Sequence, residues 1–147
     1  MIAGALLICL VVGVTDGDTL KVRCGEPGAY EQVKVRISAI DAPESRQAYG
    51  QRAKQALSDL CMGQQASIKP LAIDRYERTL ADVQCQGEDA GGTLVRSGMA
   101  WVYDQYAKGH RHLYRLQDLA RAEQLGVWAD AEPVAPWLWR AERKAAK

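Results

Sequence analysis

The sequence predicts a mainly β domain of the α+β class, a small five-stranded Greek-key barrel with helices attached to it. Five short segments with strand character lie within the first 85 residues, and turn residues separate them. Helical spacing of apolar residues appears once between these segments and dominates the later part of the chain. The 147 residues are 48% apolar and 25% charged, which is typical of a soluble globular domain that buries its own core.

We expect the first two strands to form a hairpin. Residues 2–14 are rich in Leu, Ile and Val, and residues 19–24 make the second strand. Between them, Asp16-Gly17 favours a two-residue turn, because Gly and Asp tolerate positive φ. The first stretch also resembles the apolar part of a secretion signal, but no Lys or Arg precedes it. We therefore interpret it as a strand and expect any signal peptide to lie upstream or to be absent.

Three further strands and three helical segments follow. Residues 32–40 alternate between apolar and polar and stop before Pro43, because proline cannot donate to a β ladder. Residues 65–73, interrupted by Pro70, predict an edge strand, and residues 79–85 predict the fifth strand. Helical spacing is present over 49–60, is weak over 93–97 and is firm over 113–120.

We divide the chain into a domain at 1–128 and a C-terminal tail at 129–147. The tail contains Pro133, Pro136, Trp137 and Trp139. We expect its tryptophans to pack the tail against the body, the alternative being that they stack on a base. Beyond the start, nothing approaches 18 consecutive apolar residues, so we expect no transmembrane helix and no membrane partner.

Charge and fold class bear on the class of ligand. A net charge of +1 excludes electrostatic binding of nucleic acid by the whole surface, but it is compatible with a local basic patch. Acidic residues outnumber basic ones over 1–44, and the reverse holds over 45–80. This distribution can place a cation site beside an anion-binding surface, and an ordinary mixed surface is the alternative. The OB-fold, one small Greek-key barrel, commonly binds oligonucleotides.

The four cysteines indicate disulfides rather than a metal site. None is in a C-x-x-C pair, which argues against zinc, and an even number allows two disulfides with three connectivities. With the turn at Asp16-Gly17, Cys9 lies opposite Cys24, within disulfide reach. Strict counting makes this a hydrogen-bonded pair, which is less favourable, and one bulge would change that. The alternative is four buried, reduced cysteines.

Three polar clusters stand out. They are Asp16-Gly17-Asp18-Thr19 at the turn, Arg36 with Asp41-Ala42-Pro43-Glu44 after the third strand, and Asp74 to Arg78 between two later strands. Each by itself has an ordinary structural explanation, as turn residues, a strand end or a charged loop. Two histidines, His110 and His112, lack a third ligand, and we interpret them as surface residues.

Together, the clusters supply the groups that phosphodiester cleavage needs. A hard divalent cation prefers carboxylate and carbonyl oxygens, which Asp18, Asp41 and a nearby backbone carbonyl provide. Glu44, three residues beyond Asp41, is the candidate general base that deprotonates water. Arg36 and Arg78 are the candidate phosphate ligands, since a guanidinium binds two phosphate oxygens at once.

The motifs resemble those of the staphylococcal nuclease, or thermonuclease, family. The matching stretches are V-x-D-G-D-T (14–19), V-R-I-x-x-I-D-A-P-E (35–44), D-R-Y-x-R-T (74–79), L-V-R-x-G-M-A-W-V-Y (94–103) and L-G-V-W (125–128). They cover roughly residues 7–128, and the cysteines with P-W-x-W-R (136–140) resemble a Gram-negative branch. The resemblance implies an OB-type five-stranded barrel with three helices.

The resemblance also implies a function and a set of site residues. It implies a monomeric, Ca²⁺-dependent endonuclease that cleaves DNA and RNA and leaves 3′-phosphate ends. The alternative is an inactive family member that binds nucleic acid without cutting it, which the presence of every acidic and arginine position disfavours. The implied roles are general base for Glu44, phosphate binding for Arg36 and Arg78, Ca²⁺ ligation for Asp18, Asp41 and the carbonyl of Ala42, a secondary role for Asp16 and Thr19, and substrate binding for Arg75, Tyr76 and Tyr103.

Two departures and one disulfide complete the expectations. Glu77 stands where the family usually has glycine, and its charge is expected to tilt or partly neutralise Arg78. The loop at 45–49 is shorter than in the best-known member, so substrate access is expected to differ. In the family's fold, the helix ending near Cys61 lies close to the strand ending near Cys85, so we expect these two cysteines to pair once Cys9 has paired with Cys24. Two disulfides favour a secreted or periplasmic protein.

Overall fold

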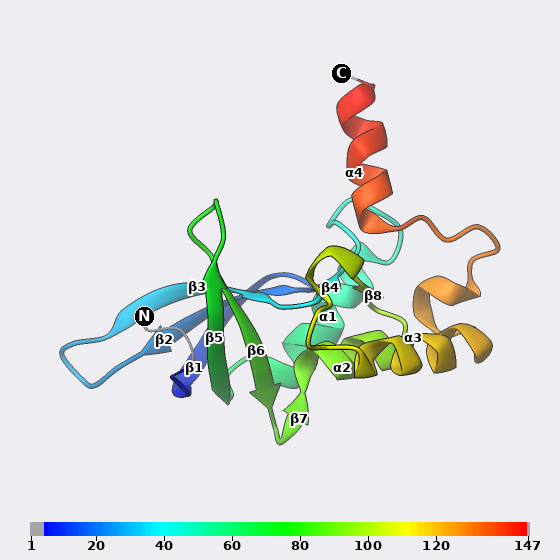
Figure 1. The fold of residues 1–147 in the computed structure, drawn as a ribbon. Coiled ribbons are helices and arrows are strands. Elements are labelled where there is room, and N and C mark those ends of the chain that lie inside the picture. Colours follow the sequence, from blue (N-terminus) through cyan, green and yellow to red (C-terminus); the bar gives the residue numbers. More distant parts are fainter. Residues whose placement is uncertain (1–4, 147) are drawn as a thin grey trace.

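The structure is a computed structural model that describes residues 5–146, and its centre is a closed barrel of five strands (Figure 1). The strands are β1 (Leu7–Asp16), β2 (Thr19–Cys24), β3 (Glu31–Ile37), β5 (Gln65–Ile73) and β6 (Thr79–Cys85). They are hydrogen-bonded in the order β3-β2-β1-β5-β6, and a parallel pairing between β3 and β6 closes the sheet. Closure protects the long strands from edge-to-edge association. The predicted five-stranded barrel of the mainly β α+β class is confirmed.

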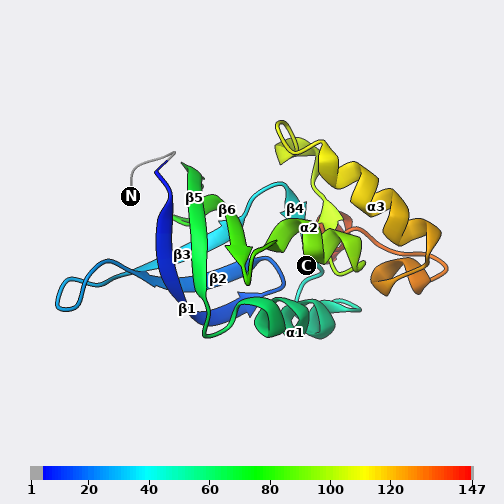
Figure 2. The same cartoon turned by 90° about the horizontal axis from the view of Figure 1, so that it is seen from below.

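Short strands and helices cover one end and one side of the barrel. The short strands are β4 (Ile40–Asp41), which pairs with β8 (Trp101–Val102), and β7 (Glu88–Asp89), which pairs with β6. The helices are α1 (Gly50–Cys61), α2 (Ala90–Arg96), α3 (His112–Ala122) and α4 (Pro136–Ala145), with 3₁₀ turns η1 (Asp104–Tyr106) and η2 (Gly126–Ala129). Helix α1 lies against β1, α2 contacts both α1 and β6, and α3 lies along α2 (Figure 2).

The fourth helix, α4, lies in the C-terminal tail and is additional to the three helices that were expected. It begins at Pro136, a residue that favours the first turn of a helix because it has no N–H to leave unpaired. Its first turn and Arg140 contact the body, and residues 141–146 are exposed. The helix therefore stands away from the barrel and the other helices (Figure 1).

The turn between β1 and β2 lies one residue later than predicted. Asp16 pairs with Thr19, so Gly17 and Asp18 form the turn in place of Asp16 and Gly17. Two register shifts in β1, at 11–13 and 14–16, offset the later position of the turn. Leu10 therefore lies opposite Arg23, which is the pairing that the predicted turn implies. The expected strand at 2–14 is present as β1 from Leu7, and residues 1–4 lie outside the described residues.

Both expected disulfides are present. Cys9–Cys24 joins β1 to β2 with a Cα–Cα distance of 4.5 Å, the spacing of a non-hydrogen-bonded pair, which the bulges in β1 allow. Cys61–Cys85 joins the last residue of α1 to the last residue of β6, with a Cα–Cα distance of 5.3 Å. All four side chains are buried. Two disulfides indicate an oxidising, extracytoplasmic environment.

The prediction that 65–73 is an edge strand is wrong, because β5 pairs with strands on both sides. Its pairing with β1 covers Gln65 to Ile68 only, however, and Pro70 lies beyond it at a bulge opposite β6. The proline is tolerated there because no second ladder needs its missing N–H.

One cluster of buried apolar side chains extends from the barrel interior to the helices. Its largest fully buried members include Leu20, Ile37, Leu57, Ile68, Leu94 and Leu113. This core fixes α1 and α2 against the barrel end at which the first two polar motifs meet. Within residues 5–146, none of the helices combines the length and the apolar character that a membrane crossing requires.

Candidate active site

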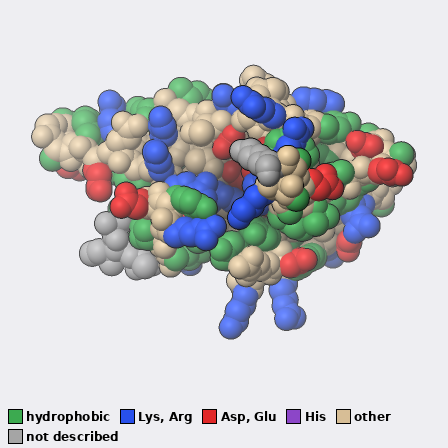
Figure 3. Space-filling model, turned by 90° about the horizontal axis from the view of Figure 1, so that it is seen from above, with side chains coloured by type: hydrophobic (Ala, Val, Ile, Leu, Met, Phe, Trp, Pro, Cys, Tyr) green, Lys and Arg blue, Asp and Glu red, His purple; other side chains and the backbone are tan. Residues whose placement is uncertain are grey.

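The acidic residues of the first two polar motifs meet at one end of the barrel. The β2–β3 ladder places Thr19 opposite Arg36, so the turn that carries Asp18 lies beside the end of β3. The backbone N–H of Ala42 donates to Asp18 Oδ2 at 2.8 Å and ties this turn to the segment that follows β4. Seen from the side on which α4 stands, acidic side chains are recessed at the centre and Lys and Arg side chains gather around them (Figure 3).

Asp18 is buried and held from two sides. The hydroxyl of Thr19 donates to its Oδ1 at 2.9 Å, and Ala42 donates to its Oδ2. The turn that carries Asp18 packs too closely for a side chain at residue 17. A Cβ added to Gly17 would lie 2.7 Å from the Cβ of Ala53 and 2.9 Å from that of Ala42. The glycine of the turn motif is therefore required by close packing against α1 and the β4 segment.

Arg36 lies between the two buried aspartates. Its Nη2 is 3.6 Å from Asp18 Oδ2 and 3.5 Å from Asp41 Oδ1, and its Nη1 donates to the carbonyls of Ile37 and Ile40 at 2.7 Å each. Asp41 is only 1% exposed. Burial raises the pKa of Asp41, and the negative charge of Asp18 adds to this effect, against the opposing influence of the arginines.

Arg140 of α4 is a site residue that the sequence analysis missed. Its Nη2 donates to Asp41 Oδ2 at 2.7 Å, and its Nη1 lies 3.1 Å from Asp41 Oδ1 and 2.7 Å from Glu44 Oε1. The hydrogen bond to Asp41, supported by Glu44 and opposed by partial burial, raises the pKa of Arg140, so its guanidinium stays charged. The signal available in the sequence was the P-W-x-W-R motif, whose proline starts a helix that carries the arginine.

Glu44 lies at the start of a tightly folded loop and is one-third exposed. Its backbone N–H donates to the side chain of Gln47 at 3.1 Å, and its carbonyl accepts from the backbone of Gln47 at 2.8 Å. A Cβ on Gly50 would lie 1.9 Å from the carbonyl oxygen of Glu44, so this loop packs directly on the start of α1. Asp16 accepts a hydrogen bond from Ser45 at 2.8 Å, which places Asp16 in support of the loop.

The chemistry of this group of residues fits a hydrated divalent cation. Asp18 and Asp41 offer carboxylate oxygens, and calcium completes its shell of six to eight oxygens with backbone carbonyls and water. Across residues 5–146, no three His, Cys, Asp or Glu side chains converge in the way a fully protein-built metal site requires. A cation here would therefore take most of its ligands from the backbone and from solvent.

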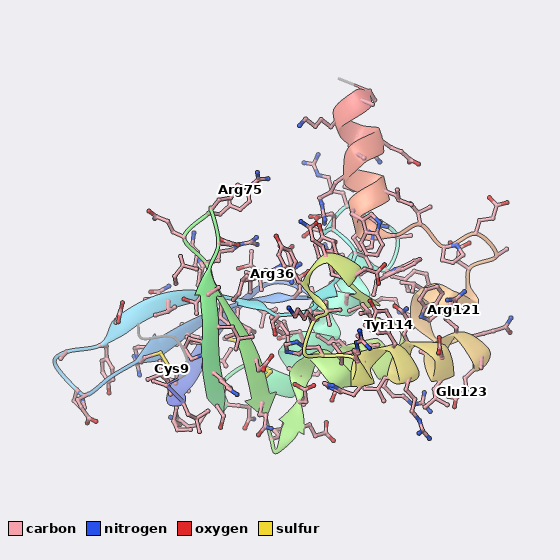
Figure 4. The ribbon with its side chains drawn as sticks, in the orientation of Figure 1. Cys9, Arg36, Arg75, Tyr114, Arg121 and Glu123 are labelled. Carbon is pink, nitrogen blue, oxygen red and sulfur yellow. A yellow bond between two sulfur atoms is a disulfide. The ribbon has the colours of Figure 1, made fainter. Side chains whose placement is uncertain are left out.

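Among the described residues, the third motif forms no hydrogen bond or ion pair with Asp18 or Asp41, although its last residue, Thr79, pairs with Val35 beside Arg36. Arg78 donates through Nε to Asp74 Oδ2 at 2.8 Å, and its guanidinium lies 5.5 Å from the centre of the Tyr76 ring. Burial works to raise the pKa of Asp74, but hydrogen bonds from Arg78 and Tyr76 outweigh it and leave the pKa below its ordinary value. Arg75 lies at the tip of the β5–β6 hairpin, apart from Arg36 at the barrel end (Figure 4).

Glu77 adopts a backbone conformation that favours glycine. Its φ is +63°, in the left-handed region where a Cβ is unfavourable. This conformation gives a physical reason for the glycine that is usual at this position. The ionic partner of Arg78 in the structure is Asp74, four residues before it.

Tyr103 is covered by the tail. Its ring is stacked on Trp137 at 5.3 Å with an interplanar angle of 4°, and Tyr106 packs edge-on against it at 5.1 Å. Trp137 also packs edge-on against Trp101 at 5.7 Å. The prediction that the tail tryptophans pack against the body is therefore confirmed for Trp137.

The partners of the two histidines are Asp82 and Asp89, not the candidate cation ligands Asp18 and Asp41. His112 is exposed, as predicted, but His110 is partly buried, with Nε2 2.6 Å from Asp82 Oδ1. Both line a pocket of about 470 Å³ that shares no residue with the group around Asp41. The prediction of a surface position is therefore wrong for His110. Its partner Asp82 lies on β6, 28 residues earlier, so the sequence around His110 does not indicate the contact.

Comparison with known proteins identifies the family. The model of the family described as "Staphylococcal nuclease homologue" matches residues 34–130. A Haemophilus influenzae protein named "Uncharacterized endonuclease" is 42% identical over 137 residues, which cover 92% of this chain and 74% of that protein. A Shigella flexneri protein named "Micrococcal nuclease" is 38% identical, with 92% of this chain and 82% of that protein covered.

More distant similarity extends to plants. A protein of Arabidopsis thaliana named "Staphylococcal-like nuclease CAN1" is 32% identical over 114 residues, which cover 78% of this chain and 35% of that protein. The bacterial relatives match over most of both chains, and the family model spans the segment that carries Arg36, Asp41, Glu44 and Arg78. The chain therefore belongs to the staphylococcal nuclease family.

Proposed function

We propose that this chain is a Ca²⁺-dependent endonuclease that hydrolyses phosphodiester bonds in DNA and RNA. The observation that carries the proposal is the meeting of Asp18, Asp41 and Glu44 with Arg36 at one barrel end, in a chain of this family. The relatives named as endonuclease and micrococcal nuclease support the same reaction class.

Each residue of the group has a proposed task. Asp18, Asp41 and the carbonyl of Ala42 would hold the calcium ion, which when bound supplies positive charge next to the scissile phosphate. The carboxylate of Glu44 takes a proton from water, whose oxygen attacks phosphorus while the bond to the 5′ oxygen breaks. The departing 5′ oxygen takes a proton from solvent, so the products are a 3′-phosphate and a 5′-hydroxyl. Arg36 stabilises the charge that develops on the phosphate oxygens.

The β5–β6 hairpin is the proposed substrate-binding arm. Tyr76 is 62% exposed, and the guanidiniums of Arg75 and Arg78 lie 5.0 and 5.5 Å from its ring centre. An exposed ring flanked by arginines suits a base and its phosphates. We propose that Arg78 exchanges Asp74 for substrate phosphate, and that Tyr103, stacked on Trp137, is a second contact for the nucleotide.

The remaining assignments are proposed with this function. They comprise a monomer, a secreted or periplasmic location in keeping with the two disulfides, and a nuclease-like domain at 1–128 followed by a tail at 129–147. Arg140 of this tail donates to Asp41 and Glu44, two residues of the proposed site. Asp16 and Thr19 act by supporting the loop of Glu44 and the carboxylate of Asp18.

Incubation of the full chain with plasmid DNA and with total RNA, first with Ca²⁺ and then with a chelator, tests the proposal. We expect cleavage of both in Ca²⁺, loss of cleavage with chelator, and 3′-phosphates on end-group analysis. Binding of both nucleic acids without cleavage would support the alternative, a non-cutting binding module of the same fold.

A further inference from the structure

The guanidinium of Arg140 engages both oxygens of the carboxylate that is proposed to bind the cation. Oδ2 of Asp41 accepts from Nη2 at 2.7 Å, and Oδ1 lies 3.1 Å from Nη1. Arg36 lies 3.5 Å from the same Oδ1. A cation that binds Asp41 therefore meets a carboxylate whose two oxygens already have cationic partners.

The same guanidinium is hydrogen-bonded to Glu44, the proposed general base. Nη1 of Arg140 donates to Glu44 Oε1 at 2.7 Å, a charge-assisted hydrogen bond that draws on the lone pairs a proton would use. One side chain thus links the proposed cation ligand to the proposed base, although it lies 99 residues from Asp41 in the sequence.

Arg140 is presented by a helix that is anchored only at its beginning. Trp137, three residues earlier and on the same face of α4, stacks on Tyr103, and the carbonyl of Val134 accepts from the side chain of Gln47 at 2.7 Å. Residues 141–146 are exposed. The side chain of Arg140 can therefore leave Asp41 without disturbing the barrel core.

We infer that Arg140 is a positioning residue of the active site, the resident counter-ion of Asp41 and Glu44, which a divalent cation replaces on Asp41. The inference rests on the proposed function, because it takes Asp41 as a cation ligand. Competition follows from chemistry: the cation needs an oxygen that Arg140 holds, and two positive groups on one carboxylate repel each other. Replacement also releases Glu44 from its hydrogen bond to Arg140.

Isothermal titration of the full-length protein with Ca²⁺ alone tests this inference without any reading of activity. Removal of the competing guanidinium is expected to lower the Kd for Ca²⁺ roughly 10- to 100-fold in Arg140→Gln, the scale of one charge-assisted hydrogen bond. Arg140→Lys keeps the positive charge but loses the two-pronged guanidinium. Its Kd for Ca²⁺ is expected to lie between those of Arg140→Gln and the unaltered protein.

Arg143→Gln is the matched control, since Arg143 lies one turn further along α4, over the ring of Trp139 at 4.6 Å. Its Kd should equal that of the unaltered protein. A Kd for Ca²⁺ in Arg140→Gln that equals or exceeds that of the unaltered protein overturns the inference. If Arg140→Gln does not fold, the same comparison is made with Arg140→Lys.

Asp41→Asn separates this inference from the function on which it rests. Loss of Ca²⁺ binding in Asp41→Asn supports the cation site whatever Arg140 does. If the unaltered protein binds Ca²⁺ and Arg140→Gln binds it no more tightly, only the inference fails. If the unaltered protein binds no Ca²⁺, the proposed cation dependence fails together with the inference.

Discussion

At the scale of single residues, the site is organised by charge. Three carboxylates, from Asp18, Asp41 and Glu44, share two guanidiniums, from Arg36 and Arg140. Removing one partner from a buried pair is costly, because the charge that remains is neither solvated nor compensated. Replacements that keep shape and hydrogen bonding therefore give the cleanest tests of catalytic roles.

Glu44→Gln is expected to lower turnover by about 10²–10⁴, because an amide cannot take the proton of the attacking water. The amide oxygen can still accept from Arg140, so the fold and the docking of α4 should persist. Initial rates on plasmid DNA in Ca²⁺, with thermal unfolding as a check on folding, measure the effect. Glu31→Gln, an exposed acid on β3, is the control, and unchanged turnover in folded Glu44→Gln would rule out the general-base role.

Glu77→Asn is expected to stabilise the protein by about 0.5–1 kcal/mol, because Asn tolerates the left-handed conformation better than Glu does. The φ of +63° at Glu77 is the reason for choosing this site. Glu77→Gln separates backbone strain from charge, since it removes the charge and keeps the strain, and its stability should stay close to that of the unaltered protein. Urea denaturation measures both, and equal stability of the two variants would contradict the role of φ.

At the scale of elements, the loop between β4 and α1 depends on a close backbone approach at Gly50. A Cβ added to Gly50 would lie only 1.9 Å from the carbonyl oxygen of Glu44. The loop is also tied to its surroundings by Ser45 to Asp16 and by Gln47 to Val134. The position of the proposed base therefore depends on the start of α1 and on the tail.

Gly50→Ala is expected to cost about 2 kcal/mol or more of stability and to lower turnover as well, because the loop must move to admit a methyl group. Gly13→Ala is the matched control, since its added Cβ would meet Lys21 at an ordinary 3.5 Å. Urea denaturation and initial rates are measured for both variants. A Gly50→Ala protein as stable and active as Gly13→Ala would contradict the close approach.

At the scale of the whole molecule, periodic features were predictable and long-range contacts were not. Strand alternation and turn residues predicted the barrel, but the two bulges in β1 leave no trace in alternation, so the turn was placed one residue early. The docking of Arg140 on Asp41 joins residues 99 apart, and no local pattern encodes it. Arg78 is expected to bind phosphate, and its partner in the structure is Asp74, four residues before it.

The last prediction concerns the disulfides, which fasten the barrel and α1 away from the site. Cys9–Cys24 and Cys61–Cys85 close loops of 15 and 24 residues, so each should stabilise by about 3 kcal/mol in the chain-entropy model. The double variants Cys9→Ala/Cys24→Ala and Cys61→Ala/Cys85→Ala should each lower the Tm by roughly 6–12 °C. Turnover at room temperature should persist, because no cysteine lies among the proposed catalytic groups. Calorimetry measures the shift, and non-reducing peptide mapping checks the pairing. Four alkylatable thiols in natively expressed protein would contradict both the stabilisation and the oxidising environment.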